Sequence, residues 1–253
     1  MKKFLLFLAF AVFFMGCMDE KKEAKVADVN SSKQEVVKLG VSMDYPPFEF
    51  IDDNNNPAGF DIELMQAVAK KVGFELELNN ISFDGLIPAL KAGKIDAIMS
   101  AMSATEDRRK SVDFSDTYYS TENLFIRKKG SDVNQNSLVD KQIGVQLGTL
   151  QESAAKKIEG AKVIPADNVL SAIMGLKAGK IDVVLIDSSI GYGYLKQNED
   201  LEEFYKVADG SEGFSIAFEK DKKAELIKKI NSALKELKDD GTFEKIEEKY
   251  NLK

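Results

Sequence analysis

A stretch of seven residues, LKAGKID, occurs twice in this chain, at positions 90–96 and 176–182. Each copy follows a short amphipathic segment and precedes an apolar run. Its glycine, Gly93 or Gly179, suits the left-handed position that ends a helix before a strand begins. Chance reuse of a good helix-ending sequence is one explanation. Identical residues in two equivalent contexts favour another, in which the chain folds into two lobes that are built alike.

Short runs rich in β-branched residues alternate with helical patterns from residue 36 onward. Apolar residues recur at helical spacing over 60–72 and over 222–239, which predicts two amphipathic helices. The predicted strands are 36–43, 74–81, 95–102, 124–128, 142–147, 162–165, 181–186 and 214–218. This alternation predicts an α/β fold with largely parallel sheets.

Residues 1–17 read as a lipoprotein signal peptide rather than as part of the fold. Two lysines precede an apolar run over 4–15, which is too short to span a bilayer as a helix. Cys17, the only cysteine of the chain, follows a glycine as in a bacterial lipobox, so we predict that it is lipidated and becomes the mature N-terminus. An ordinary cleaved signal peptide is the alternative.

Residues 18–35 form a predicted flexible tether, because they contain no aromatic residue and mix acids, lysines, Asn and Ser. Asn30 lies in an acid-x-Asn-x-Ser pattern, which is the extended acceptor pattern of bacterial N-glycosylation. A plain solvated linker is the other interpretation of this segment.

The composition excludes several classes of chemistry. The 253 residues include no histidine, which excludes Ser-His-Asp triads, Cys-His dyads and histidine-ligated metals. A single cysteine excludes an internal disulfide, a thiolate zinc cluster and an iron–sulfur site. The formal net charge is -7 and the lysines are scattered among acids, so the chain lacks a basic patch for nucleic acid. We therefore expect no metal, no cofactor and no nucleic-acid partner.

Polar residues follow the strand that comes after each copy of the repeat. Ser100 and Ser103 follow the first strand, and Asp187 follows the second. Ligands of open α/β sheets bind beyond the carboxyl ends of the strands, so two facing lobes would bring these side chains into one cleft. Arg108 lies near the start of a predicted helix capped by Thr105, from which it can reach back toward the serines. A solvated helix residue is the alternative for Arg108.

Residues 36–253 resemble the bacterial extracellular solute-binding proteins of family 3, the amino-acid receptors of ABC importers. The motifs that carry the resemblance occur in family order: DYPPFEF at 44–50, GFDIE at 59–63, LIPALKAGKIDAIMSAMSATEDRR at 86–109, DFS at 113–115 with YY at 118–119, IGVQLGT at 143–149, GKID at 179–182, and DGTF at 240–243 with KY at 249–250. Together they cover nearly the whole segment.

The resemblance implies a two-lobe periplasmic-binding-protein (Venus-flytrap) clamshell with two hinge strands. Lobe 1 would comprise 36–123 and 214–253, and lobe 2 would comprise 124–213. The hinge strands would lie near 124–128 and 213–218. The chain would thus leave lobe 1 and return to it.

The resemblance also implies a bound L-amino acid. Arg108 would fork its α-carboxylate, with backbone amides of Ser103 and Leu150 adding donors and Thr149 lining the same wall. Asp187 and Ser103 would hold the α-ammonium, together with the backbone oxygen of Ala101. This arrangement agrees with physical chemistry, because a zwitterion taken from water needs both ends neutralised and a guanidinium matches a carboxylate bidentately.

By resemblance, Tyr45 and Phe83 would sandwich the ligand side chain, with core packing as the alternative for both. Relatives that bind basic amino acids usually carry an acid at the position of Ser42, and this departure argues against a strongly basic preference. Glu122 is a candidate for a compensating charge. The predicted ligand-binding residues are Ser42, Tyr45, Phe83, Ser100, Ala101, Ser103, Arg108, Gln146, Thr149, Leu150, Gln151 and Asp187.

These features predict an extracytoplasmic substrate-binding protein of an ABC transporter, and not an enzyme. It would capture a polar or basic L-amino acid, such as arginine, lysine, histidine or glutamine, by lobe closure and deliver it to permease subunits in the inner membrane. We expect a monomer in the periplasm or at the cell surface, anchored to a membrane through Cys17. One alternative is a dehydratase of the same fold acting on arogenate or prephenate, and another is a surface adhesin or receptor. Asp187 with its serines suits an ammonium, which favours binding.

Overall fold

The computed structural model describes residues 35–252. The predicted signal peptide with its lipidation site Cys17, the predicted glycosylation site Asn30 and all of the predicted tether except its last residue lie outside the described residues. None of the described helices is long and apolar enough to cross a membrane.

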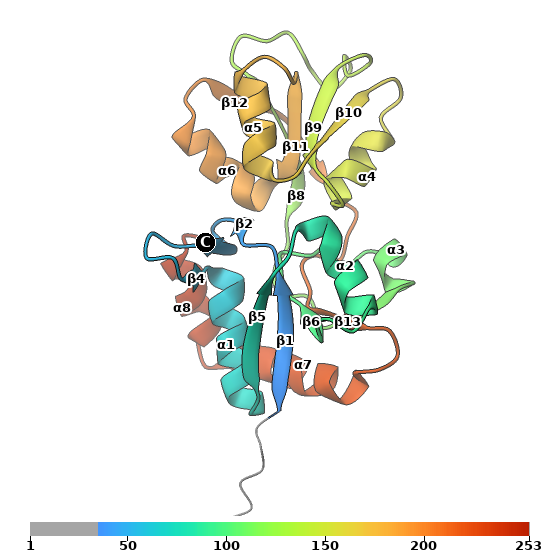
Figure 1. The fold of residues 1–253 in the computed structure, drawn as a ribbon. Helices are drawn as coiled ribbons and strands as arrows, with labels where there is room; N and C mark the ends of the chain where they lie inside the picture. The colour runs from blue at the N-terminus through green and yellow to red at the C-terminus, as the bar shows by residue number, and fades with distance from the viewer. Residues whose placement is uncertain (1–34, 253) are drawn as a thin grey trace, which may run out of the picture. The chain divides into compact units, whose positions relative to one another are not determined.

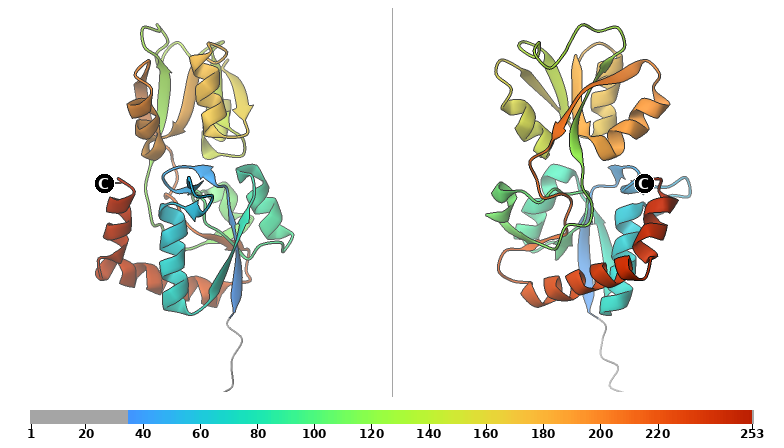
Figure 2. Two further views of the ribbon diagram at one scale, coloured as in Figure 1. Left: turned by 60° about the vertical axis from the view of Figure 1, so that its left-hand side comes forward. Right: turned by 180° about the vertical axis from the view of Figure 1, so that it is seen from behind.

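Two five-stranded sheets form the centres of two lobes, lobe 1 and lobe 2 (Figures 1 and 2). This confirms the predicted α/β fold with two lobes. The strand order in lobe 1 is β5 (Glu75–Asn80), β1 (Val36–Val41), β6 (Ala97–Ile98), β13 (Ala217–Glu219) and β7 (Val112–Phe114). The order in lobe 2 is β10 (Lys162–Ala166), β9 (Gln142–Gln146), β11 (Val183–Asp187), β8 (Glu122–Lys128) and β12 (Leu201–Ala208).

Both sheets share one pattern of strand directions. In each, the first three strands are parallel, and the last two are antiparallel to their neighbours. The prediction of largely parallel sheets therefore fails for β8 and β13, which run against both of their neighbours. β7, β8, β12 and β13 flank the two passages of the chain between the lobes, and antiparallel neighbours need no helical crossover.

The helices lie around the two sheets (Figure 1). They are α1 (Phe60–Val72), α2 (Phe83–Lys91), α3 (Glu106–Arg109), α4 (Leu150–Lys156), α5 (Val169–Lys177), α6 (Ser188–Gln197), α7 (Ala224–Asp239) and α8 (Thr242–Lys249). The bounds of α1 match the prediction, and α7 begins two residues after the predicted start at 222. A small antiparallel sheet follows β1, built from β2 (Asp44–Tyr45), β3 (Glu49–Ile51) and β4 (Pro57–Ala58), and was not predicted.

The two copies of LKAGKID adopt the same local structure in the two lobes. Gly93 and Gly179 end α2 and α5 with φ values of 66° and 70°. Asp96 then accepts a hydrogen bond from a backbone N–H of β1 at 3.1 Å, and Asp182 accepts the equivalent bond from β9 at 2.8 Å. Each copy thus ends a helix and fastens the following strand, which is the middle strand of its sheet, to the neighbouring parallel strand β1 or β9.

The chain passes between the lobes at two short segments, 120–121 and 209–213. On the lobe 1 side, the Phe214 N–H donates to the Tyr119 carbonyl at 2.8 Å. On the lobe 2 side, Glu122 and Ala208 are already paired within the second sheet. The predicted hinge strand at 124–128 lies within β8, which begins directly after the first passage and pairs with β11 and β12 inside lobe 2. The lobe boundaries predicted from the resemblance remain predictions.

Gly213 lies at the lobe 1 end of the second passage. Its φ is +107°, and a Cβ there would lie 2.4 Å from the Tyr119 carbonyl oxygen and 2.6 Å from the Thr117 Cγ2. Only glycine combines this backbone conformation with this close approach. The two passages therefore lie against each other where they leave lobe 1.

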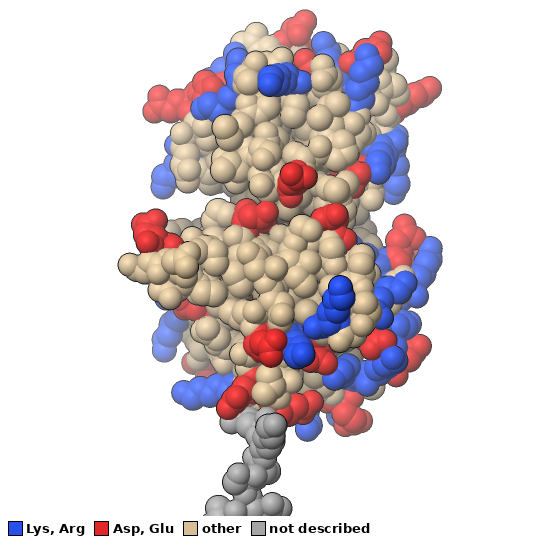
Figure 3. All heavy atoms as spheres, viewed as in Figure 1, with Lys and Arg blue, Asp and Glu red and all other residues tan. Residues whose placement is uncertain are grey.

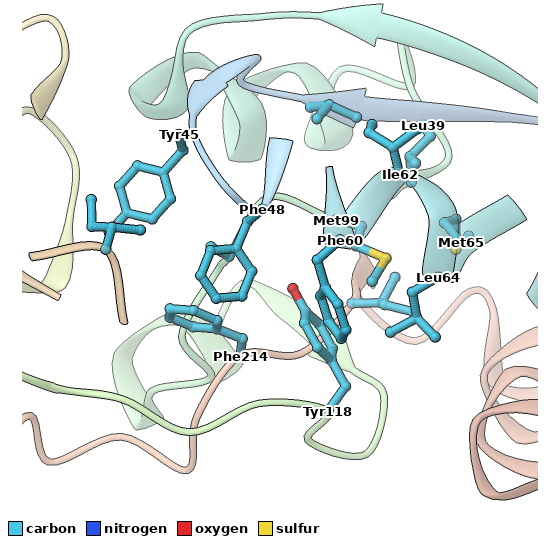
Figure 4. Close-up of a cluster of buried hydrophobic side chains, with 14 of the residues drawn as sticks. Leu39, Tyr45, Phe48, Phe60, Ile62, Leu64, Met65, Met99, Tyr118 and Phe214 are labelled. Carbon is cyan, nitrogen blue, oxygen red and sulfur yellow. The ribbon is translucent and has the colours of Figure 1, made fainter. Parts of the chain in front are cut away.

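A cluster of aromatic side chains lies in the core of lobe 1 next to the passages (Figure 4). Phe48, Phe60 and Phe214 are wholly buried. The ring of Phe48 packs edge-on against Phe214 at 5.3 Å and against Tyr119 at 5.0 Å between centroids. Fully burying a side chain of this size stabilises a fold by roughly 1.5–3 kcal/mol. The cluster therefore fixes the loop that carries Tyr45 relative to the segments that connect the lobes.

Candidate functional site

A cleft lies between the ends of the two central sheets. Every ligand-binding residue predicted from the sequence lines this cleft, and two acids join them. The lining residues are Ser42, Asp44, Tyr45, Glu49, Phe83, Ser100, Ala101, Ser103, Arg108, Gln146, Thr149, Leu150, Gln151 and Asp187. The structure thus brings all the predicted residues together, while their contacts with a ligand remain predictions.

Arg108 reaches across the cleft from the short helix α3. Thr105 caps this helix, and its Oγ1 accepts the Arg108 N–H at 3.2 Å. The guanidinium donates from Nη1 to the Ser103 carbonyl at 2.8 Å and from Nη2 to the Gly148 carbonyl at 3.1 Å. It also lies 5.3 Å from the centroid of the Phe83 ring. Arg108 is therefore not a solvated helix residue, which was the alternative.

Burial lowers the pKa of Arg108 to about 10, so the side chain is charged at neutral pH. A guanidinium has five N–H donors, and the two bonds to carbonyl oxygens use only part of this capacity. The remaining donors can fork a carboxylate placed in the cleft.

The start of α4 forms the lobe 2 wall that faces Arg108. Thr149 caps the helix, because its Oγ1 accepts the Glu152 N–H at 3.2 Å. The same hydroxyl donates to the Gln146 carbonyl at 2.6 Å. Leu150 is the first residue of the helix, where backbone N–H groups have no intrahelical partner. The backbone amide predicted as a donor to the ligand thus lies at a helix N-terminus that favours an anion.

Asp187 ends β11 and is buried in the cleft. Its Oδ1 accepts a hydrogen bond from Gln151 Nε2 at 2.8 Å, and its Oδ2 accepts one from the Tyr45 hydroxyl. Burial raises the pKa of Asp187 to about 7, while these bonds and the charge of Arg108 oppose that rise. A cation placed beside the carboxyl group would complete its ionisation at neutral pH.

The turn after β6 presents Ser100 and Ala101 to the cleft. The Ser100 hydroxyl donates to Glu49 Oε1 at 2.8 Å and accepts the Ser42 N–H at 3.0 Å. Ala101 has a φ of +42°, which is unfavourable for a residue with a Cβ. Its N–H donates to Asp61 Oδ2 at 2.8 Å, so a buried carboxyl group holds the turn in this conformation.

Asp44 and Glu49 are the lining residues that the sequence analysis missed. Strand pairing places Glu49 opposite Tyr45 in the β2–β3 hairpin, and cross-strand neighbours lie on the same face. Asp44 accepts a hydrogen bond from the Ser42 hydroxyl at 3.1 Å. An acid thus lies beside Ser42, the position at which relatives that bind basic amino acids carry one. The suggestion that Glu122 supplies a compensating charge was wrong. Glu122 forms an ion pair with Lys206 at 2.6 Å and does not line the cleft.

The cleft has more acidic than basic side chains among the described residues. Asp44, Glu49 and Asp187 are its acids, and Arg108 is its base. On the face shown in Figure 3, acidic side chains also lie along the boundary between the lobes. The Gln146 side chain is buried, and neither its oxygen nor its nitrogen has a partner in the part of the chain that the structure describes.

Comparisons with known proteins agree with this geometry. The model of the bacterial extracellular solute-binding proteins, family 3, matches residues 37–253. A probable histidine-binding protein of Campylobacter jejuni is 43% identical over 100% of both chains. The arginine-binding extracellular protein ArtP of Bacillus subtilis is 37% identical over 99% of this chain and 98% of its own.

An ancestral arginine-binding protein has been solved with arginine bound and with glutamine bound. It is 40% identical to this chain with a TM-score of 0.81, and the arginine-bound structure covers 86% of this chain and 98% of its own. All these relatives are named as binding proteins rather than enzymes. The predicted two-lobe clamshell and the predicted family are therefore both confirmed, and this chain belongs to the bacterial extracellular solute-binding proteins, family 3.

Proposed function

We propose that this protein is the substrate-binding component of an ABC importer and captures an L-amino acid with a cationic side chain, with arginine as the preferred ligand. One observation carries the proposal. A bound zwitterion would use one base and one acid of the cleft, Arg108 and Asp187, which leaves Asp44 and Glu49 to face the side chain. Two acids beside the ligand side chain favour a cation, and the names of the relatives support arginine or histidine.

The proposed pose follows from the donors and acceptors of the cleft. The α-carboxylate lies on Arg108 and the N-terminus of α4, and the α-ammonium lies beside Asp187. The unpartnered amide of Gln146 then hydrogen-bonds the ligand. Closure of the lobes around it would present the loaded receptor to permease subunits in the inner membrane.

A thermal-shift panel over all twenty amino acids tests the proposal on protein freed of bound ligand by unfolding and refolding. We expect arginine to raise the melting temperature most, followed by lysine and histidine. A ligand at 100 times its dissociation constant adds about 2.7 kcal/mol of stability. Stabilisation by neutral amino acids alone would contradict the proposal.

Glutamine is the second candidate ligand. The Gln146 amide offers both a donor and an acceptor that have no partner among the described residues, which suits another carboxamide. The ancestral relative has also been solved with glutamine. The same panel separates the two candidates, because a cleft built for glutamine would bind citrulline and glutamine better than arginine.

We also propose that a lipid on Cys17 anchors the protein to a membrane in the periplasm or at the cell surface, with 18–35 as its tether. Metabolic labelling with a fatty acid should mark the wild type and not Cys17→Ala. Soluble, unlabelled protein from both would contradict the anchor.

Incubation with prephenate and arogenate tests the dehydratase alternative, for which we expect no turnover.

A further inference from the structure

Two buried carboxyl groups lie at the cleft wall: Glu49 on β3 is part of the lining, and Asp61 in the first turn of α1 lies behind it. Glu49 Oε1 accepts a bond from the Ser100 hydroxyl. Asp61 Oδ2 accepts the Ala101 N–H and the Tyr118 hydroxyl, both at 2.8 Å. The other oxygens, Glu49 Oε2 and Asp61 Oδ1, receive no donor from any other described group.

Burial, and after it the charge of Asp61, raise the pKa of Glu49, so the two carboxyl groups lie within electrostatic reach of each other. Two carboxylates cannot supply the donor that the two remaining oxygens lack, because neither has a proton to donate. One proton between them supplies the missing donor for the two remaining oxygens. With that proton Glu49 and Asp61 form an acid–carboxylate pair with a single negative charge, as two carboxyl groups that share a buried site do in aspartic proteases.

The groups that face the pair are acidic or neutral. Asp44 from β2 and Asp61 itself act on Glu49, and the hydroxyls of Tyr45 and Tyr118 lie within electrostatic reach. Burial raises the pKa of Asp61 to about 7 and that of Glu49 well above its usual range. The base of the cleft, Arg108, bonds to backbone carbonyls and acts on Asp187, on the opposite wall.

We propose that the Glu49–Asp61 pair is a proton-releasing receptor for the ligand's side-chain cation. Without a cation beside Glu49 the pair keeps its shared proton. When a guanidinium or ammonium binds there, the O–H bond of the pair breaks, both carboxyl groups become anions, and the proton passes to solvent. One positive charge enters the cleft and one leaves. The inference rests on the proposed function, because it requires a cationic ligand.

The pair would therefore set specificity through protonation. A ligand with a neutral side chain leaves the shared proton on the Glu49–Asp61 pair, and its side chain then contacts a pair with a single negative charge. A cation displaces the proton and meets two carboxylates. Because binding of the cation releases a proton, the affinity for a cationic ligand rises with pH, by at most about tenfold per pH unit for one proton.

Titration calorimetry in two buffers with different ionisation enthalpies counts the released protons. Arginine and its neutral isostere citrulline are the probes, on ligand-free protein at pH 7. In the proposed pose Asp187 faces the α-ammonium of both probes, so any proton that it releases is common to both and cancels in the difference. We expect roughly one more proton released per arginine than per citrulline. Equal proton counts would overturn the inference and leave the proposed function standing, whereas absence of arginine binding would overturn both.

Three variants separate the pair's charge from a packing role. Glu49→Gln can still accept from Ser100 and donate to Asp61. We expect it to lose the extra proton and to weaken arginine at least about 30-fold, with citrulline changed by less than about threefold. Asp61→Asn removes the shared proton but keeps Glu49, so arginine should bind at least as tightly and release fewer protons. Asp44→Asn is the matched control outside the pair, and it should weaken arginine while the proton difference persists.

Equal losses for arginine and citrulline in Glu49→Gln would show a packing role and overturn the inference. If that variant fails to fold, infrared difference spectroscopy on the wild type decides. Arginine binding should remove the carbonyl band of a protonated carboxyl group, and citrulline binding should not. Persistence of that band with arginine bound would overturn the inference.

Discussion

Arg108 is the only described base of the cleft, and it is held by contacts from both lobes. We expect Arg108→Ala to abolish amino-acid binding while the protein remains folded, because its hydrogen bonds go to carbonyl oxygens near the surface of the cleft. Truncating one member of a buried charge pair costs about 2–5 kcal/mol, which is about 30-fold to several-thousand-fold in affinity. Titration calorimetry with arginine measures the loss.

Arg108→Lys is the control for this substitution. It keeps the charge but cannot fork a carboxylate, so it should recover only part of the affinity. Far-ultraviolet circular dichroism checks that both variants fold. An Arg108→Ala protein that binds within about threefold of the wild type would remove Arg108 from the site.

Whether a cleft residue could be predicted from the sequence depended on what determines the direction of its side chain. Ser100 and Asp187 were found because they follow strands of a repeated unit, and such strands end at one edge of a sheet. Glu49 was missed although its motif was recognised. Its direction is set by the pairing of Glu49 with Tyr45 across a hairpin, and the sequence carried no signal for that register. Nor could it show that Asp61 lies behind the same wall.

The repeated helix-ending unit makes a prediction about two elements at once. Gly93 and Gly179 have φ values of 66° and 70°, and a Cβ at either would meet nothing within 4 Å. The cost of a side chain at either position therefore comes from the left-handed backbone conformation and not from a steric clash. We therefore expect Gly93→Ala and Gly179→Ala each to destabilise the protein by about 1–2 kcal/mol, measured by urea denaturation. The Asn variants should cost less, because Asn tolerates this conformation. A loss for one glycine and none for the other would show that the two units differ.

Secondary-structure elements could be predicted from the sequence where a long periodic pattern is present. They could not be predicted where strand pairing determines their bounds and direction. Helix α1 has apolar residues at regular helical spacing, and its bounds were predicted correctly. Strand β7 has three residues, too few for a pattern, and β12 buries only its first residue, Leu201. The direction of the strands next to the passages depends on how the chain leaves one sheet and enters the other, and no pattern within β8 or β13 shows this.

At the level of the whole molecule, buried carboxyl groups give the ligand-free protein an unusual pH dependence. Burial raises the pKa of Asp61 and of Asp187 to about 7, from 3.8. Between about pH 4 and 7 the folded state therefore binds more protons than the unfolded state, so the free energy of unfolding falls as pH rises. Below that window the sign reverses, because ion pairs and hydrogen bonds lower the pKa of acids such as Asp240, to about 2.

We accordingly expect the ligand-free protein to melt at a higher temperature at pH 5 than at pH 7.5. Each extra bound proton changes stability by about 1.4 kcal/mol per pH unit. Calorimetric scans at constant ionic strength measure this dependence. Asp187→Asn removes one of the titrating groups and should flatten the dependence. A melting temperature that rises from pH 5 to pH 7.5 would show that these carboxyl groups are ionised in the folded protein.

The last prediction concerns the two lobes together. The Tyr45 hydroxyl bonds to Asp187 and the Arg108 guanidinium to the Gly148 carbonyl, so lobe 1 and lobe 2 are in contact at the cleft. A ligand that touches both lobes favours the closed arrangement, and only such differential affinity can shift the equilibrium. We expect ligand-stripped protein to have a larger radius of gyration in solution scattering than arginine-loaded protein, with bending at 120–121 and 209–213. Gly148→Ala is the control, because its Cβ would lie 2.8 Å from the Asp84 Cα and should hold the lobes apart even with ligand present. Identical curves for stripped and loaded wild type would mean that the cleft is closed without ligand, and the receptor would then load by brief opening rather than by a ligand-driven change of state.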